Sequence, residues 1–137
     1  MVEQTTRYGI SITVALPYDQ AVERTREALA TEGFGVLSEI DVAATLKKKL
    51  DVDFRPYIIL GACNPPLAHQ ALTAERDIGL LLPCNVIVYA ADEQGRSVVA
   101  AMDPAEALSL AGNAALVPLS EEVKSRLQRV LASIEKG

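Results

Sequence analysis

Residues 8–32, YGISITVALPYDQAVERTREALATE, decide the fold because the spacing of their apolar residues changes at Pro17. Every second residue from Ile10 to Val14 is apolar, which predicts a strand with one buried face. After Pro17 the apolar residues recur at helical spacing, so we expect a helix over residues 18–32. A strand followed at once by an amphipathic helix indicates a sheet that is covered by helices.

Four further strands are predicted toward the C-terminus, over residues 34–40, 55–63, 85–91 and 97–102. The strand at 55–63 is apolar almost throughout, so we expect it to be covered on both faces or to lie centrally. Short helices are predicted at 42–50, 65–75 and 105–111. Asp41 and Asn64 are expected to cap the first two, and Asp103, which precedes Pro104, is interpreted as a turn and cap residue at the start of the third. This order of strands and helices is typical of an α+β domain.

The chain ends in a further amphipathic helix, for which we expect Ser120 to be the N-cap. Its inward side is predicted to consist of Val123, Leu127, Val130, Leu131 and Ile134. With 137 residues, of which half are hydrophobic, the chain is expected to form one domain over residues 1–137. A chain of this size buries enough surface to fold without a metal or a disulfide.

The charge and the motifs of the chain exclude several classes of partner. The net charge is −5 and the isoelectric point is about 4.9. The only basic run, Lys47–Lys49, is interpreted as the solvated side of a helix, so we expect no nucleic-acid partner. No glycine-rich phosphate motif occurs. Because no leader peptide and no membrane span are recognised, we expect a cytoplasmic protein without membrane contact.

Residues 61–90, GACNPPLAHQALTAERDIGLLLPCNVIVYA, hold both cysteines of the chain and its only histidine. If the strands that flank this segment pair antiparallel, their adjoining ends lie at one end of the sheet. We therefore expect five side chains to converge on one rim and to form a ligand-binding site: Cys63, Asn64, His69, Cys84 and Asn85.

The chemistry of this rim is left open by the residues alone. The cysteines can be small buried core residues. Alternatively, Cys63 can be a reactive thiol beside a helix start. A metal site would use Cys63, His69 and Cys84 but lacks an obvious fourth ligand. A disulfide between the two cysteines is the remaining alternative. No cofactor is indicated.

Three functions follow from these alternatives. The first is a binding or accessory module for a small ligand, a soft metal or a sulfur species at the rim. The second is a thiol-dependent redox or transfer enzyme that uses Cys63 or Cys84 as nucleophile and His69 as base. The third is a structural or interaction protein whose dimer is the functional surface. The sequence does not decide whether the chain is an enzyme.

Four blocks of the sequence resemble a known family in their order along the chain: EGFGVLSEIDVAATLKKKL at 32–50, YIILGACNPPLAHQAL at 57–72, IGLLLPCNVIVY at 78–89 and MDPAEALSLAGN at 102–113. They resemble the domain of unknown function 302 family of small bacterial and archaeal domains, over roughly residues 10–134. The resemblance implies a fold like that of TATA-binding protein, β-α-β4-α, with a curved antiparallel sheet and two long helices packed on one face. It also implies a homodimer. It implies no activity, and the likeness of fold carries no inference of DNA binding.

Overall fold

The computed structural model describes all 137 residues, and its six strands form one antiparallel sheet in the order β1-β2-β6-β5-β4-β3. The strands are β1 (Glu3–Thr6), β2 (Gly9–Val14), β3 (Gly35–Asp41), β4 (Tyr57–Cys63), β5 (Cys84–Ala90) and β6 (Ser97–Met102). The α-helices are α1 (Tyr18–Thr31), α2 (Val42–Leu50), α3 (Pro65–Ala74), α4 (Pro104–Leu108) and α5 (Val117–Lys136). Three 3₁₀ turns complete the chain: η1 (Arg76–Leu81), η2 (Ser109–Ala111) and η3 (Ala114–Leu116).

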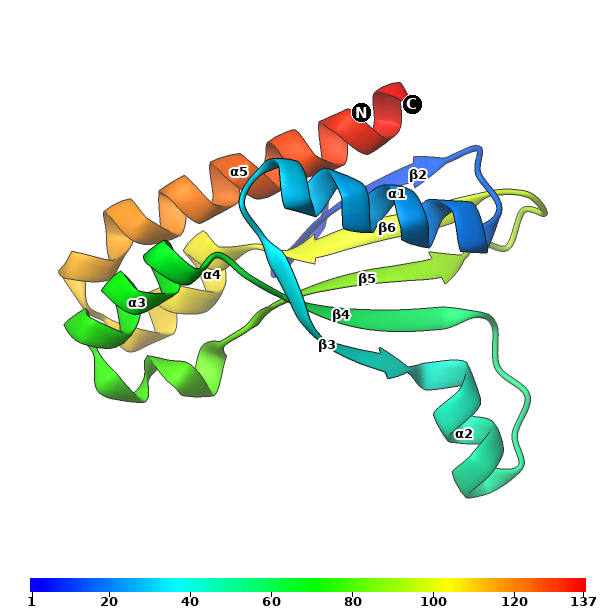
Figure 1. Cartoon of the computed structure of the whole chain (residues 1–137), viewed down its shortest axis with the longest axis horizontal. Helices are drawn as coiled ribbons and strands as arrows, with labels where there is room; N and C mark the ends of the chain where they lie inside the picture. The colour runs from blue at the N-terminus through cyan, green and yellow to red at the C-terminus, as the bar shows by residue number, and fades with distance from the viewer.

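The two long helices, α1 and α5, lie against each other on one face of the open sheet (Figure 1). The frame β2-α1-β3-β4-β5-β6-α5 is the predicted β-α-β4-α order, so the predicted fold class is confirmed. Alternate residues of the central strands point toward the helices, and their register aligns them in rows. For example, Ile12 and Val88 each pair with Val99, and these residues are almost completely buried. A slip of one residue would turn such a row to the other face.

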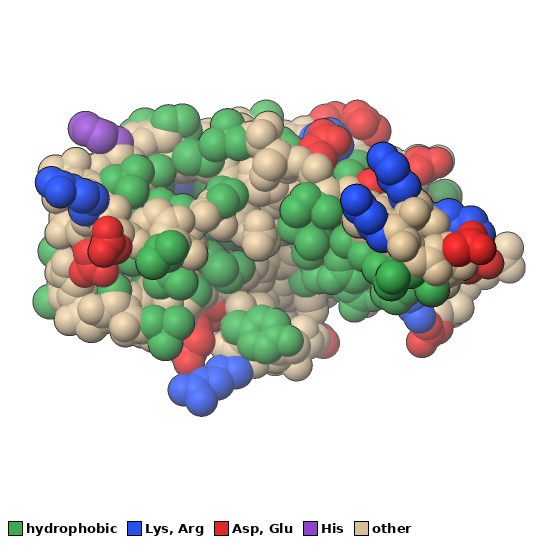
Figure 2. Space-filling model, turned by 90° about the horizontal axis from the view of Figure 1, so that it is seen from below, with side chains coloured by type: hydrophobic (Ala, Val, Ile, Leu, Met, Phe, Trp, Pro, Cys, Tyr) green, Lys and Arg blue, Asp and Glu red, His purple; other side chains and the backbone are tan.

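The opposite face of the sheet carries neither long helix and is also apolar. Its central side chains are half-buried: Tyr57, Ile59, Ile87, Tyr89 and Val98. The rings of Tyr57 and Tyr89 stack across β4 and β5, with centroids 5.2 Å apart and planes at 7°. Figure 2 shows this face from below, with hydrophobic side chains gathered beside the charged side chains at the α2 end.

The apolar character of β4 was misread from the sequence. Helices cover only one of its faces, and it lies beside the edge strand β3 rather than at the centre of the sheet. Its inward residues, such as Leu60, belong to the core, whereas its outward residues, such as Ile59, belong to the face without helices.

Two other sequence predictions are wrong in detail. β1 was not predicted, because its four residues are all exposed and show no apolar alternation; backbone pairing with β2 and a hydroxyl contact from Thr5 to Ser11 hold it. The last helix begins at Val117, so Ser120 is no cap. The Ser120 hydroxyl instead donates to the Val117 carbonyl oxygen within the helix.

Asp103 joins the sheet to the helical layer. Its carboxylate accepts hydrogen bonds from the backbone N–H groups of Ala105 and Glu106 and thereby caps α4, as the sequence predicted. The other carboxylate oxygen lies 2.9 Å from the Lys124 ammonium of α5. The Asp103 side chain is only 5% exposed, so this ion pair is largely shielded from water.

We expect Asp103→Ala to lower the free energy of unfolding by about 2–4 kcal/mol, because it removes a cap and leaves Lys124 without its partner. The matched control is Asp92→Ala, which breaks the exposed pair of Asp92 with Arg55 and should cost less than about 1 kcal/mol. Chemical denaturation of both variants measures the difference. Equal losses of unfolding free energy in the two variants would show that burial of the ion pair between Asp103 and Lys124 adds nothing to stability.

Candidate functional site

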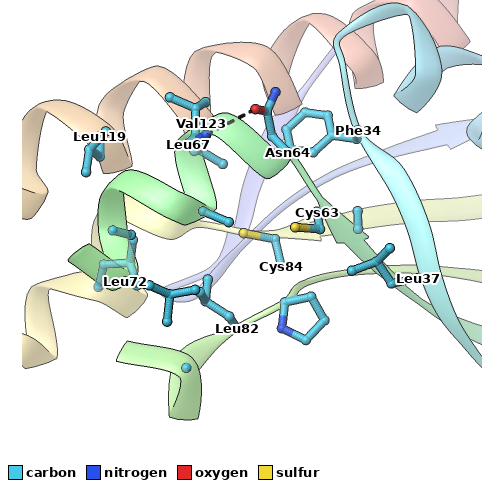
Figure 3. Close-up of a pocket in the computed structure, with 16 residues that line it drawn as sticks. Phe34, Leu37, Cys63, Asn64, Leu67, Leu72, Leu82, Cys84, Leu119 and Val123 are labelled. Atoms are coloured by element: carbon cyan, nitrogen blue, oxygen red, sulfur yellow. Dashed lines mark hydrogen bonds between the residues drawn. The ribbon is translucent and has the colours of Figure 1, made fainter. Parts of the chain in front are cut away.

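β4 and β5 meet at one end of the sheet, where Ala62 pairs with Cys84. Cys63 ends β4, and the chain then forms α3 and η1 before it returns as β5. A cavity of about 290 Å³ lies between this segment, the sheet end and α5 (Figure 3). Sixteen residues line it, of which 13 are hydrophobic: Phe34, Leu37, Ala62, Cys63, Asn64, Leu67, Ala68, Ala71, Leu72, Gly79, Leu82, Pro83, Cys84, Leu108, Leu119 and Val123.

The cavity separates the two hydrophobic clusters of the molecule. On one side is the main core beneath α1 and α5, to which Phe34 and Ala62 belong. On the other side is a cluster of four buried residues among α3, η1, α4 and η3, which includes Ala71 and Leu108. The cavity is therefore a space between two packed units and is lined by apolar atoms from both.

Asn64 positions the start of α3, as predicted. Its side-chain oxygen accepts a hydrogen bond from the Leu67 N–H at 3.4 Å, which is the geometry of an N-cap. Its side-chain nitrogen donates to the Glu32 carbonyl oxygen, which also accepts from Arg126 of α5. Both ends of the Asn64 amide are thus engaged, and the residue links α1, α3 and α5 at the cavity wall.

The two cysteines both line the cavity, and neither forms a disulfide. Cys84 is 7% exposed, and Cys63 is half-buried. Burial raises the pKa of the Cys84 thiol from 9.0 to about 11, and the neighbouring Cys63 adds to this rise. Cys84 is therefore a protonated thiol at neutral pH. Figure 3 shows both sulfur atoms within the cavity region.

The other two predicted site residues do not join this group. His69 lies on the exposed side of α3 and does not line the cavity, so the expected reach from His69 to the cysteines is wrong. Asn85 is exposed and follows Cys84 in β5, so its side chain points to the opposite face of the sheet. The structure brings together three of the five predicted residues: Cys63, Asn64 and Cys84.

Sequence reasoning missed most of the cavity wall. Phe34, Leu119 and Val123 come from distant parts of the chain, and only the tertiary fold brings them to α3. Leu72 contributes to the wall although the residue is 42% exposed. No group of three or more His, Cys, Asp or Glu side chains is arranged to hold a metal ion. No helix has the length and apolarity that crossing a membrane requires.

The raised pKa of Cys84 predicts a loss of stability at alkaline pH. The folded protein keeps this proton up to about pH 11, whereas the unfolded chain loses it near pH 9.0. The protonated Cys84 thiol therefore contributes about 2–3 kcal/mol to the free energy of unfolding. This contribution is fully present below pH 9 and is lost as the pH rises to about 11. Chemical denaturation of wild type and Cys84→Ala at several pH values checks it. A stability difference that stays constant across this range would contradict the assignment.

Comparison with known proteins agrees with this fold. The model of the family described as Domain of unknown function DUF302 matches residues 10–134. The solved structure of an uncharacterized conserved protein DUF302 from Bacillus stearothermophilus is similar to this chain, with 29% sequence identity and a TM-score of 0.85. The match covers 94% of this chain and 99% of that one. No curated protein matches the chain. Since the family model spans nearly the whole sequence, and the fold agrees with that of the solved DUF302 structure, the chain belongs to the DUF302 family.

Proposed function

We propose that the protein is a binding module for a small, uncharged and largely apolar molecule, which occupies the cavity at the end of β4 and β5. The observation that carries this proposal is the composition of the wall: 13 of its 16 residues are hydrophobic and none is charged. A pocket of this kind binds by excluding water from apolar surface. A charged ligand would lose its hydration there without gaining a partner.

The size of the cavity sets the size of the ligand. An engineered apolar cavity of about 150 Å³ in another protein takes up benzene. The cavity here, at about 290 Å³, has nearly twice that volume. A ligand with two fused rings, or an aliphatic molecule of similar bulk, fits this volume.

The polar atoms of the wall favour the same class of ligand. Both ends of the Asn64 side chain are already hydrogen-bonded within the protein. The remaining polar groups in the wall are the thiols of Cys63 and Cys84, which are weak hydrogen-bond partners but suit polarizable ligands. Shape and dispersion would therefore decide which molecules bind.

We expect naphthalene and indole to raise the melting temperature of the wild-type protein, and Ala68→Leu to abolish this effect by filling the cavity. Stabilisation by a bound ligand grows as RT ln(1 + [L]/Kd), so tenfold excess over Kd gives about 1.4 kcal/mol. The matched control is Ala74→Leu, the same change at an exposed position of α3 outside the cavity. Thermal denaturation with and without probe measures the effect.

The charged analogue 1-naphthoate provides the second control. It should stabilise the protein much less than naphthalene at the same concentration, because the wall offers no cation. If neither neutral probe shifts the melting temperature of wild type, or if Ala68→Leu retains the full shift, this cavity is not the binding site.

We further propose that the protein is a homodimer that uses the face without helices. Support comes from large hydrophobic side chains that are at least 45% exposed along one stretch of chain, residues 37–54: Leu37, Ile40, Leu50, Val52 and Phe54. They adjoin the half-buried apolar residues of the sheet, and the Phe54 ring lies 6.1 Å from that of Tyr57. Contiguous apolar surface of this kind is typical of an interface.

We expect Phe54→Glu to weaken dimerisation at least about 30-fold, the effect of losing about 2 kcal/mol at a central interface residue. The control is Leu110→Glu, at an exposed residue of η2. η2 directly follows α4, which lies at the end of the molecule opposite α2 (Figure 1). Sedimentation equilibrium over a range of concentrations measures both. A monomeric wild type, or dissociation by the control alone, would exclude this interface.

We place the protein in the cytoplasm as part of this proposal. Both cysteines are free, and thiols persist in the reducing conditions of that compartment.

A further inference from the structure

The cavity brings together two thiols that the proposed binding function does not require as a pair. Cys63 and Cys84 stand at adjoining ends of neighbouring strands, and both face the same cavity (Figure 3). Each is free. The remaining wall residues offer no acid, base or cation with which either thiol could act. The reaction that these two side chains can undergo together is therefore the formation of a disulfide between them.

We propose that Cys63 and Cys84 form a dithiol that is converted to an intramolecular disulfide by exchange with a small uncharged disulfide admitted to the cavity. The proposal concerns the thiols themselves and rests on the proposed function only in that the cavity admits uncharged molecules.

The end of β4 allows this bond. Ala62 pairs directly with Cys84, and Cys63 is the next and last residue of β4. Alternation within a regular strand would turn Cys63 to the face opposite Cys84, but the strand ends at Cys63, and both side chains line the same cavity (Figure 3). Strands lie about 4.8 Å apart and rise about 3.3 Å per residue, so the two Cα atoms are about 6 Å apart, within the range of about 4.4–6.8 Å that disulfides span. The influence of Cys63 on the Cys84 thiol agrees with this proximity.

Burial assigns the order of the two steps. Cys63, the more accessible thiol, loses its proton to solvent and attacks one sulfur of the small disulfide. A bond forms between Cys63 and that sulfur, the S–S bond of the reagent breaks, and one small thiol leaves with a proton. Cys84 then loses its proton and attacks the Cys63 sulfur, which forms the intramolecular disulfide and releases the second small thiol. The protein loses two hydrogens, and the reagent gains them.

The second step is the slower one at neutral pH. Only the thiolate is nucleophilic, and burial holds the Cys84 thiol in its protonated form up to about pH 11. A mixed disulfide on Cys63 should therefore accumulate first, and its conversion should accelerate about tenfold per pH unit between pH 7 and pH 10. The product closes a ring that contains α3 and η1, the segment forming one wall of the cavity.

The experiment treats the native protein with bis(2-hydroxyethyl) disulfide and follows intact mass over time. We expect the wild type to gain one small thiol group and then to lose it, ending two hydrogens lighter than at the start. Cys84→Ala should stop at the stable mixed disulfide. Cys63→Ala should react at least about tenfold more slowly than wild type, because its remaining thiol is buried.

Two controls keep the outcome decisive. Circular dichroism shows that each variant is folded, and the same reactions in denaturant give the intrinsic rate of each thiol with each reagent. Oxidised glutathione, which is charged, should show a smaller ratio of native to denatured rate than the neutral disulfide. Equal ratios would overturn the cavity as the route of entry. Failure of naphthalene to bind would leave the disulfide itself standing.

The dithiol is excluded if native wild type ends with two separate mixed disulfides or with no intramolecular bond. It is also excluded if Cys63→Ala reacts as fast as wild type, since Cys84 would then be the accessible thiol.

Discussion

Burial of a single face of the sheet, beneath α1 and α5, is the constraint on which the rest of the molecule depends. α5 has 20 residues and is about 30 Å long, whereas a strand of six or seven residues spans only about 20–23 Å. The helix therefore extends beyond the end of the sheet (Figure 1). Its first turn, with Leu119, needs another apolar layer to cover it.

The segments between the strands supply that layer. α3 and η1 connect β4 to β5, and α4 follows β6, so all three emerge at the end of the sheet where α5 begins. They pack into a small cluster of their own beside the main core. Two clusters built on different elements do not interlock completely, and the space left between them is the cavity. The site is thus a consequence of helix length and strand order.

The same constraint explains the other face of the sheet. With both long helices on one side, the alternation of β4 and β5 places Ile59, Ile87 and the stacked tyrosines where no helix covers them. Polar residues would suit water at these positions, yet the side chains are apolar. Such a surface is stable when a second apolar surface covers it, which is why the proposed dimer uses this face.

Local patterns predicted the elements well, because strand alternation, helical spacing and the caps at Asn64 and Asp103 depend on residues close in sequence. β1 was not predicted because its four residues are all exposed and it is held mainly by backbone pairing, which is open to every sequence. The outward position of His69 could have been predicted from the sequence itself. Each helical residue turns by about 100°, so a helix that directs Ala68 and Ala71 inward turns His69 outward.

The likeness between the two Cys-Asn pairs has a structural meaning that differs from one pair to the other. Asn64 leaves the strand and caps α3, whereas Asn85 continues β5 on the face away from the cavity. Only the cysteines share an environment. Because that environment holds no charge and no free hydrogen-bonding side chain, it disfavours ionic ligands and acid–base catalysis alike. Of the two proposed processes, apolar binding is favoured by the absence of polar groups around the thiols, whereas sulfur exchange is slowed by it, because burial keeps the Cys84 thiol protonated.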